Sequence, residues 1–167
     1  IVSGSLDKTL IVRDNTTGQK SLTLEGHSEN VSSVAFSPDG KRIVSGSFDK
    51  KIKVWDVNAG QEVQTFSAHS AHIISVVFSS DGKRIASGSS DRTVKVWDAS
   101  TGREISTLKG HSHIVNSVAF SPNGKQIVSG STDKTVKVWD SETGRVMLTL
   151  PAAVFGFSLQ GHTGMVS

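Results

Sequence analysis

Short apolar runs of about five residues alternate with polar turn segments along most of the chain. Between residues 26 and 67, such runs occupy 31–36, 43–47, 51–55 and 62–66. Turn residues such as Ser-Pro-Asp-Gly separate them, since Pro fixes φ and Gly permits a positive φ. Runs of this length, each closed by a turn, predict four short strands in one antiparallel sheet. No segment keeps the 3.6-residue period over ten or more residues that a helix requires.

Three motifs recur along the chain with a period of 42 residues. The string Ser-Gly-Ser-x-Asp begins at Ser3, Ser45, Ser87 and Ser129. A Trp-Asp pair begins at Trp55, Trp97 and Trp139, and a His recurs at His27, His69 and His111. In the first copy, Arg13 takes the place of the Trp. One small sheet cannot bury both of its faces, so this repeat predicts sheets that stack side by side.

Together the His, Ser-Gly-Ser-x-Asp and Trp-Asp motifs resemble the WD40 repeat family, over essentially the whole chain. The similarity of the copies to one another resembles the WD40 arrays of fungal and bacterial signalling proteins, or a consensus-type design. The resemblance implies an all-β fold, a β-propeller in which four-stranded antiparallel blades surround a central channel.

The motif positions divide a single propeller segment, 1–167, into blades. It consists of a partial blade at 1–25, full blades at 26–67, 68–109 and 110–150, an insertion at 151–160 and the start of a further blade at 161–167. Three full and two partial blades are about half of the roughly seven or eight usual in this family. We therefore expect either a longer parent chain or a second copy that completes the ring. The apolar segment 151–159 is predicted to be either a contact site or a blade edge that packs on its own protein.

The resemblance also implies a hydrogen-bonded tetrad of His, Ser, Asp and Trp in each full blade. The tetrads are His27, Ser45, Asp49 and Trp55; His69, Ser87, Asp91 and Trp97; and His111, Ser129, Asp133 and Trp139. A buried His needs partners for two ring nitrogens, and Trp has one N–H to satisfy. Because Arg13 replaces Trp, the first copy lacks the usual fourth partner.

Ser, His and Asp are also the residues of a hydrolase triad. Their repetition argues against catalysis, because an active site is normally built once, and no Gly-x-Ser-x-Gly elbow accompanies them. Histidines 42 residues apart match no local metal motif, cysteine is absent, and no glycine-rich phosphate loop occurs. The sequence therefore predicts no catalytic residues, no metal site and no cofactor, and hence a protein that is not an enzyme.

Composition narrows the possible partners. Lys and Arg number 18 and Asp and Glu 15, and this net charge of +3 is too mild to favour nucleic acid. The basic residues are interleaved with Asp, which indicates a solvated rim, and leaves open a weak nucleic-acid or acidic-peptide surface. No apolar run is long enough to span a membrane. The absence of cysteine and of a secretory signal favours a cytoplasmic protein.

WD40 relatives mostly dock partners on the top face, near the channel. By motif position, three residues of each full blade face that side: Asn30, Ser32 and Phe48; His72, Ile74 and Ser90; and Ile114, Asn116 and Thr132. Phe48, Ile74 and Ile114 are apolar, which is typical either of peptide anchors or of residues that pack between blades. We expect a non-catalytic scaffold that binds a protein or peptide there. The alternative is a structural unit that completes a ring by homo-oligomerisation and has no ligand of its own.

Overall fold

The computed structural model describes residues 1–151, and within that range all regular secondary structure is β-strand. The strands form one three-stranded and three four-stranded sheets, each an antiparallel meander. This confirms the all-β fold and the four-stranded antiparallel blades that the repeat predicts. Apart from Pro151, the predicted insertion at 151–160 and the predicted blade start at 161–167 lie outside the described residues.

Each sheet is named here as a blade, numbered in chain order. Blade 1 contains β1 (Val2–Gly4), β2 (Leu10–Arg13) and β3 (Lys20–Leu24). Blade 2 contains β4 (Val31–Phe36), β5 (Arg42–Ser47), β6 (Lys51–Asp56) and β7 (Gln61–Ser67). Blade 3 contains β8 (Ile73–Phe78), β9 (Arg84–Ser89), β10 (Val94–Asp98) and β11 (Glu104–Leu108). Blade 4 contains β12 (Val115–Phe120), β13 (Gln126–Ser131), β14 (Thr135–Asp140) and β15 (Val146–Pro151).

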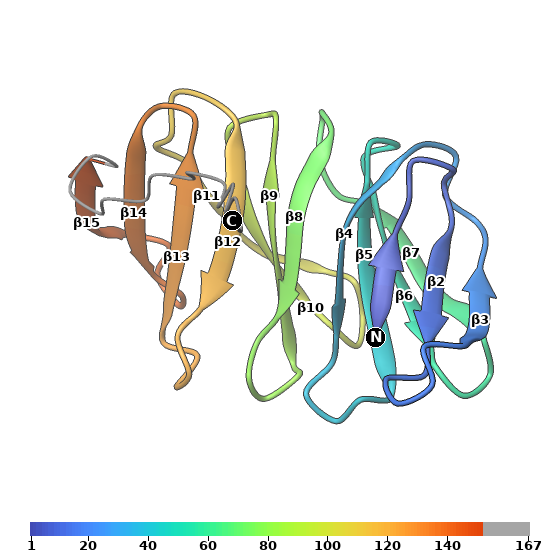
Figure 1. Ribbon diagram of the computed structural model, residues 1–167. Coiled ribbons are helices and arrows are strands. Elements are labelled where there is room, and N and C mark those ends of the chain that lie inside the picture. The colour runs from blue at the N-terminus through green and yellow to red at the C-terminus, as the bar shows by residue number, and fades with distance from the viewer. Residues whose placement is uncertain (152–167) are drawn as a thin grey trace, which may run out of the picture.

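The blades stand side by side, from blade 1 in blue to blade 4 in orange and red (Figure 1). Three separate apolar clusters join neighbouring blades. Between blades 1 and 2, for example, Leu10 and Leu24 pack with Ile43 and Trp55. The second strands of blades 2 and 3, β5 and β9, are buried on both faces along nearly their whole length, so they show no clean alternation of apolar and polar residues. The described chain is therefore an open, partial propeller.

A glycine in the second strand lets adjacent blades approach closely. A Cβ at Gly46 would lie 2.6 Å from Ile73 Cγ2 and 2.8 Å from Val76 Cγ1, closer than real side chains come. Gly88 has the same relation to Val115, at 2.7 Å. Any larger residue would therefore push the next blade away.

Blade 4 differs because no described residue covers its outer apolar face. Gly130, the equivalent of Gly46, has nothing within 4 Å of a Cβ. Val128 is 37% exposed, whereas the equivalent Val44 and Ala86 are fully buried. Leu148 on the same blade is also exposed. This surface has the composition of an interface between blades.

Candidate functional site

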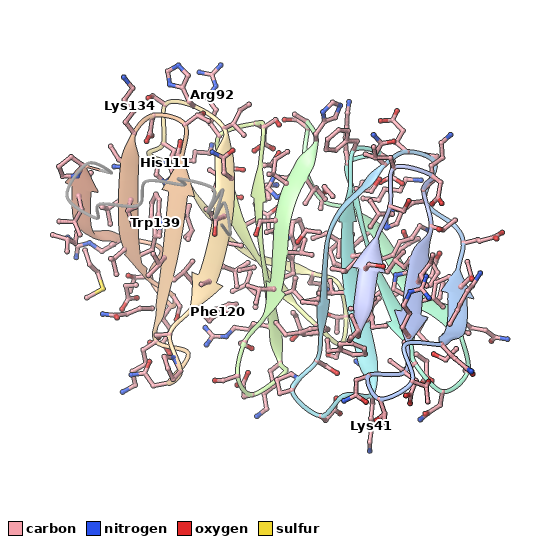
Figure 2. All side chains as sticks on the ribbon, viewed as in Figure 1. Lys41, Arg92, His111, Phe120, Lys134 and Trp139 are labelled. Atoms are coloured by element: carbon pink, nitrogen blue, oxygen red, sulfur yellow. The ribbon has the colours of Figure 1, made fainter. Side chains whose placement is uncertain are left out.

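A tetrad of side chains lies at the same place in blades 2, 3 and 4. In blade 2, His27 Nδ1 lies 2.8 Å from Asp49 Oδ2, and His27 Nε2 lies 2.7 Å from Ser45 Oγ. The indole nitrogen of Trp55 lies 2.8 Å from the same Ser45 oxygen. The matching distances in blades 3 and 4 are 2.7–2.8 Å. Figure 2 labels the His and Trp of the last tetrad, His111 and Trp139.

The secondary structure explains how four distant residues meet. The His precedes the innermost strand, the Ser is on the second strand, the Asp is in the turn that follows, and the Trp is on the third strand. Since β5 and β6 pair with Ile43 opposite Trp55, the indole can reach Ser45 on the neighbouring strand.

The hydrogen bonds of the blade 2 tetrad accommodate one consistent arrangement of protons. The Trp55 N–H can only donate, so the Ser45 hydroxyl oxygen accepts. The Ser45 hydroxyl then donates to His27 Nε2, which leaves Nδ1 as the protonated nitrogen that donates to Asp49. Together with the lowered pKa values of both groups, this arrangement is a neutral His27 beside an ionised Asp49.

Burial shifts the ionisation of this pair. Burial lowers the pKa of His27 below its usual value, and the hydrogen bond to Asp49 only partly opposes this effect. Burial raises the pKa of Asp49, but hydrogen bonds from His27 and from the N–H groups of Lys51 and Ser28 outweigh it and bring the pKa below its usual value. The pKa values of Asp91 and Asp133 also lie below their usual value, although burial alone raises them.

The tetrads are internal to the fold. The three serines are fully buried, and the three histidines are 6–7% exposed. Each serine oxygen already accepts from a Trp and donates to a His, so no hydroxyl is presented to a substrate. The geometry is that of a structural hydrogen-bond network, which links two strands, the loop that enters the blade and the turn between its second and third strands.

The turn between the second and third strands carries a cation in an unusual conformation. Lys8, Lys50, Arg92 and Lys134 all have a φ between 65° and 75°. Glycine adopts this left-handed region freely, whereas other residues pay a cost of about 1 kcal/mol. The side chains of Asp49, Asp91 and Asp133, one residue earlier, are only 3%, 11% and 6% exposed. The turns thus bury their carboxylates and expose their cations.

The predicted partner-binding residues cluster at the same end of the blades, which we call the top face. In each blade, the residue that follows the second strand donates its backbone N–H to the carbonyl of the residue that precedes the first strand. Phe48 donates to Asn30 at 2.9 Å, Ser90 to His72 at 2.9 Å, and Thr132 to Ile114 at 3.0 Å. The backbone geometry therefore repeats while the side chains differ.

The sequence left open whether Phe48, Ile74 and Ile114 face a partner or pack between blades. The Phe48 ring stacks on His72 of the next blade and is half-buried. Ile74 is half-buried, and Ile114 is 38% exposed. Ser32 Oγ lies 2.9 Å from the Gly46 carbonyl and 2.6 Å from that of Ile73, so this side chain bridges blades 2 and 3. Asn116 is exposed.

One feature of the top face, a cavity, is not indicated by the repeat motifs. A cavity of about 500 Å³ lies beside the blade 3 tetrad, and Lys95, Thr107 and Lys109 line it. The signal in the sequence is a departure from the repeat, because Lys109 stands where the other loops carry Glu25 and Ser67.

Two absences hold for residues 1–151. No cluster of three or more His, Cys, Asp or Glu side chains there is arranged to hold a metal ion. In the same range, no helix has the length and apolar character needed to cross a membrane.

Comparison with known proteins places the chain in a family. The model of the WD domain, G-beta repeat, matches residues 18–56, 60–98 and 102–140. Each match begins with or near the outermost strand of one blade and ends with the third strand of the next. No curated protein matches the chain. The three family matches cover most of the sequence, and the chain belongs to the WD40-repeat family.

Proposed function

We propose that this protein is a non-catalytic scaffold that binds a protein or peptide on its top face. The observation that supports the proposal is the contrast between a constant frame and a varied surface. The tetrads repeat with the same residues and distances. The top-face positions keep their backbone hydrogen bonds but change from Phe48 to Ser90 to Thr132. WD40 repeats generally mediate protein interactions, and this arrangement suits that role.

The proposed contact surface has apolar anchors. Phe48 and Ile74 are half-buried, and Ile114 is 38% exposed. A partially exposed aromatic ring held in place by a stack with His72 offers area to a partner without loss of side-chain freedom.

The experiment is selection of binders from a displayed library of random 12-residue peptides. Selected peptides should lose affinity for the Phe48→Gln and Ile114→Gln variants and retain it for Val63→Gln. Val63 is a matched control, since it is exposed on the outermost strand of blade 2, away from the top face. Peptides that bind all three variants equally, or a failed selection, would contradict the proposal.

A second candidate is self-assembly through the free face of blade 4. It is supported by the exposure of Val128 and Leu148 and by the open space at Gly130, all on one apolar face. Light scattering should then give about twice the chain mass of 17.7 kDa. Gly130→Ala should restore the single-chain mass, because the added Cβ occupies the space that a docked blade needs. A wild-type protein with the mass of one chain would rule this candidate out.

A further inference from the structure

Charge is unevenly distributed over the top face. In the loops of blades 3 and 4 the exposed charged residues are Arg92, Lys109 and Lys134. The two acidic residues of these loops, Asp91 and Asp133, turn their carboxylates into the tetrads. The loop that leads into blade 2 is different, because it exposes Glu25 and Glu29. Among the described residues, the half of the top face at blades 3 and 4 therefore exposes cations in its loops, whereas the two carboxylates of these loops are almost fully buried.

Two adjoining hollows lie in this half. One has a volume of about 500 Å³ and the other about 340 Å³, and both are lined by Asp91, Thr93 and Lys109. Lys95 lines the first and Arg92 the second. We call these two hollows the basic groove. His111, which lines the second hollow, is hydrogen-bonded to Asp133, the residue before Lys134.

Asp91 contributes a carboxylate to the groove wall, and this carboxylate is hydrogen-bonded within the fold. Asp91 accepts hydrogen bonds from His69 Nδ1 at 2.8 Å, from the Thr93 hydroxyl at 2.6 Å and from the Ser70 N–H at 3.2 Å. Lys95 pairs with Glu104 at 2.7 Å. Asp91 is thus held by hydrogen bonds within the fold, and its one negative charge offsets only part of the positive charge of Arg92, Lys109 and Lys134.

Within residues 1–151, the exposed cations of this half of the top face have no ion-pair partner. Among residues 1–151, the ion pairs involve other side chains, and none includes Arg92, Lys109 or Lys134. Arg92 and Lys134 also hold left-handed backbone positions that glycine would fill with less strain. Figure 2 shows both at the upper end of the molecule, opposite Lys41.

The opposite end provides an internal comparison. A cavity of about 460 Å³ there is lined by Lys41 and Arg42, but also by Asp39, Asp56 and Asp81. Opposite charges on one wall cancel at a distance, so this cavity has no preference for an anion.

We propose that the basic groove binds an acidic peptide segment, whose Asp or Glu side chains contact Arg92, Lys109 and Lys134. The proposal rests on the proposed function and names the chemistry of the partner. Complementary charge is the observation that selects this occupant, because free cations around a concave surface attract a run of carboxylates.

The test uses a fluorescent peptide with six consecutive Glu residues between Gly-Ser flanks, measured by anisotropy at low salt. The triple variant Arg92→Gln, Lys109→Gln, Lys134→Gln should weaken binding about tenfold, as expected for three exposed charge contacts. The control is Lys41→Gln, Lys83→Gln, Lys125→Gln, which removes the same charge from exposed turns at the opposite end. It should change affinity less than about twofold, since those cations lie away from the groove.

Several outcomes would overturn the proposal. Equal weakening in both triple variants would show attraction to total charge alone. No binding of the Glu peptide, or equal binding of a Gln version, would also contradict it. Tighter binding of a single-stranded oligothymidine, lost in the first triple variant, would assign the groove to nucleic acid instead. Lys109→Gln alone, with its melting temperature measured, separates loss of binding from loss of fold.

The two proposals fail in different ways. If the Glu peptide does not bind but library-selected peptides still depend on Phe48 and Ile114, the acidic partner is wrong and the scaffold function stands. If neither kind of peptide binds the top face, both proposals are wrong.

Discussion

The Phe48 ring lies parallel to the His72 imidazole, with 4.5 Å between ring centres and 7° between the planes. The two residues belong to different blades, so the stack connects the turn of blade 2 to the loop that enters blade 3. Offset or parallel aromatic pairs contribute about 0.5–1.5 kcal/mol beyond the area they bury. This contact therefore stabilises one blade boundary at the top face.

Replacing Phe48 with Ala should lower the free energy of unfolding by about 1–2 kcal/mol, from the lost stack and the lost apolar contact. Urea titration measures the change. Ser90→Ala is the matched control, because Ser90 holds the same backbone position in blade 3. Equal effects in the two variants would show that the stack contributes nothing.

Replacing Ser45 with Ala should destabilise the fold by about 2–4 kcal/mol. The change leaves the Trp55 N–H and His27 Nε2 without partners in a buried site, and each such group costs about 1–3 kcal/mol. Ser67→Ala makes the same chemical change at an exposed position on β7 and should have little effect. Similar urea midpoints for the two variants would contradict the importance of the tetrad.

Replacing Gly46 with Ala should cost about 1–3 kcal/mol, because the new methyl group collides with Ile73 and Val76. Gly130→Ala adds the same group to open space in a single chain and should be neutral or stabilising by about 0.5–1 kcal/mol. Thermal melts of both variants at low protein concentration make the comparison. Equal destabilisation would mean that the blade 4 face is covered.

Stability should fall as the pH is lowered from 8 towards 5. The pKa of His27 is lower in the folded protein than the usual value of about 6.5, so the unfolded chain takes up the proton first. This contribution is present above that pH and is lost below it. His113→Gln, a change at an exposed position, should leave the trend intact. A constant unfolding free energy over this range would contradict a buried neutral His27.

A second loss should occur below about pH 4. The pKa values of Asp49, Asp91 and Asp133 are depressed in the folded state, so the unfolded state again binds more protons as the pH falls through the usual Asp value of about 3.9. Circular dichroism during acid titration follows this step. Asp133→Asn should reduce it, and an unchanged acid transition in that variant would exclude the carboxylate as its source.

The sequence predicts what every blade shares. The expected strand at 43–47 is observed as Arg42–Ser47, and that at 62–66 as Gln61–Ser67, because turn residues mark the strand ends. The His, Ser, Asp and Trp of each repeat lie within hydrogen-bond distance, because their spacing on paired strands is the same in each copy.

Features that depend on a difference between neighbouring copies were not predicted. The Phe48–His72 stack needs an aromatic residue in one repeat and an imidazole in the next, and the motif specifies neither. The basic groove depends on Lys109, which departs from the repeat, and on the way residues of β10, β11 and two loops meet around it. The sequence also left open whether Phe48 packs between blades or is exposed. In the structure its ring packs on His72 and is half-buried.

At two successive blade boundaries, a glycine of one blade faces a β-branched residue of the next: Gly46 faces Ile73, and Gly88 faces Val115. Because the glycine contact is the same at these boundaries, removing or duplicating 42 residues joins one such contact to another of the same kind. Recombination between the repeats can thus lengthen or shorten the array by whole blades while this close approach is kept. A change in blade number therefore need not disturb the contact that sets the distance between adjacent blades.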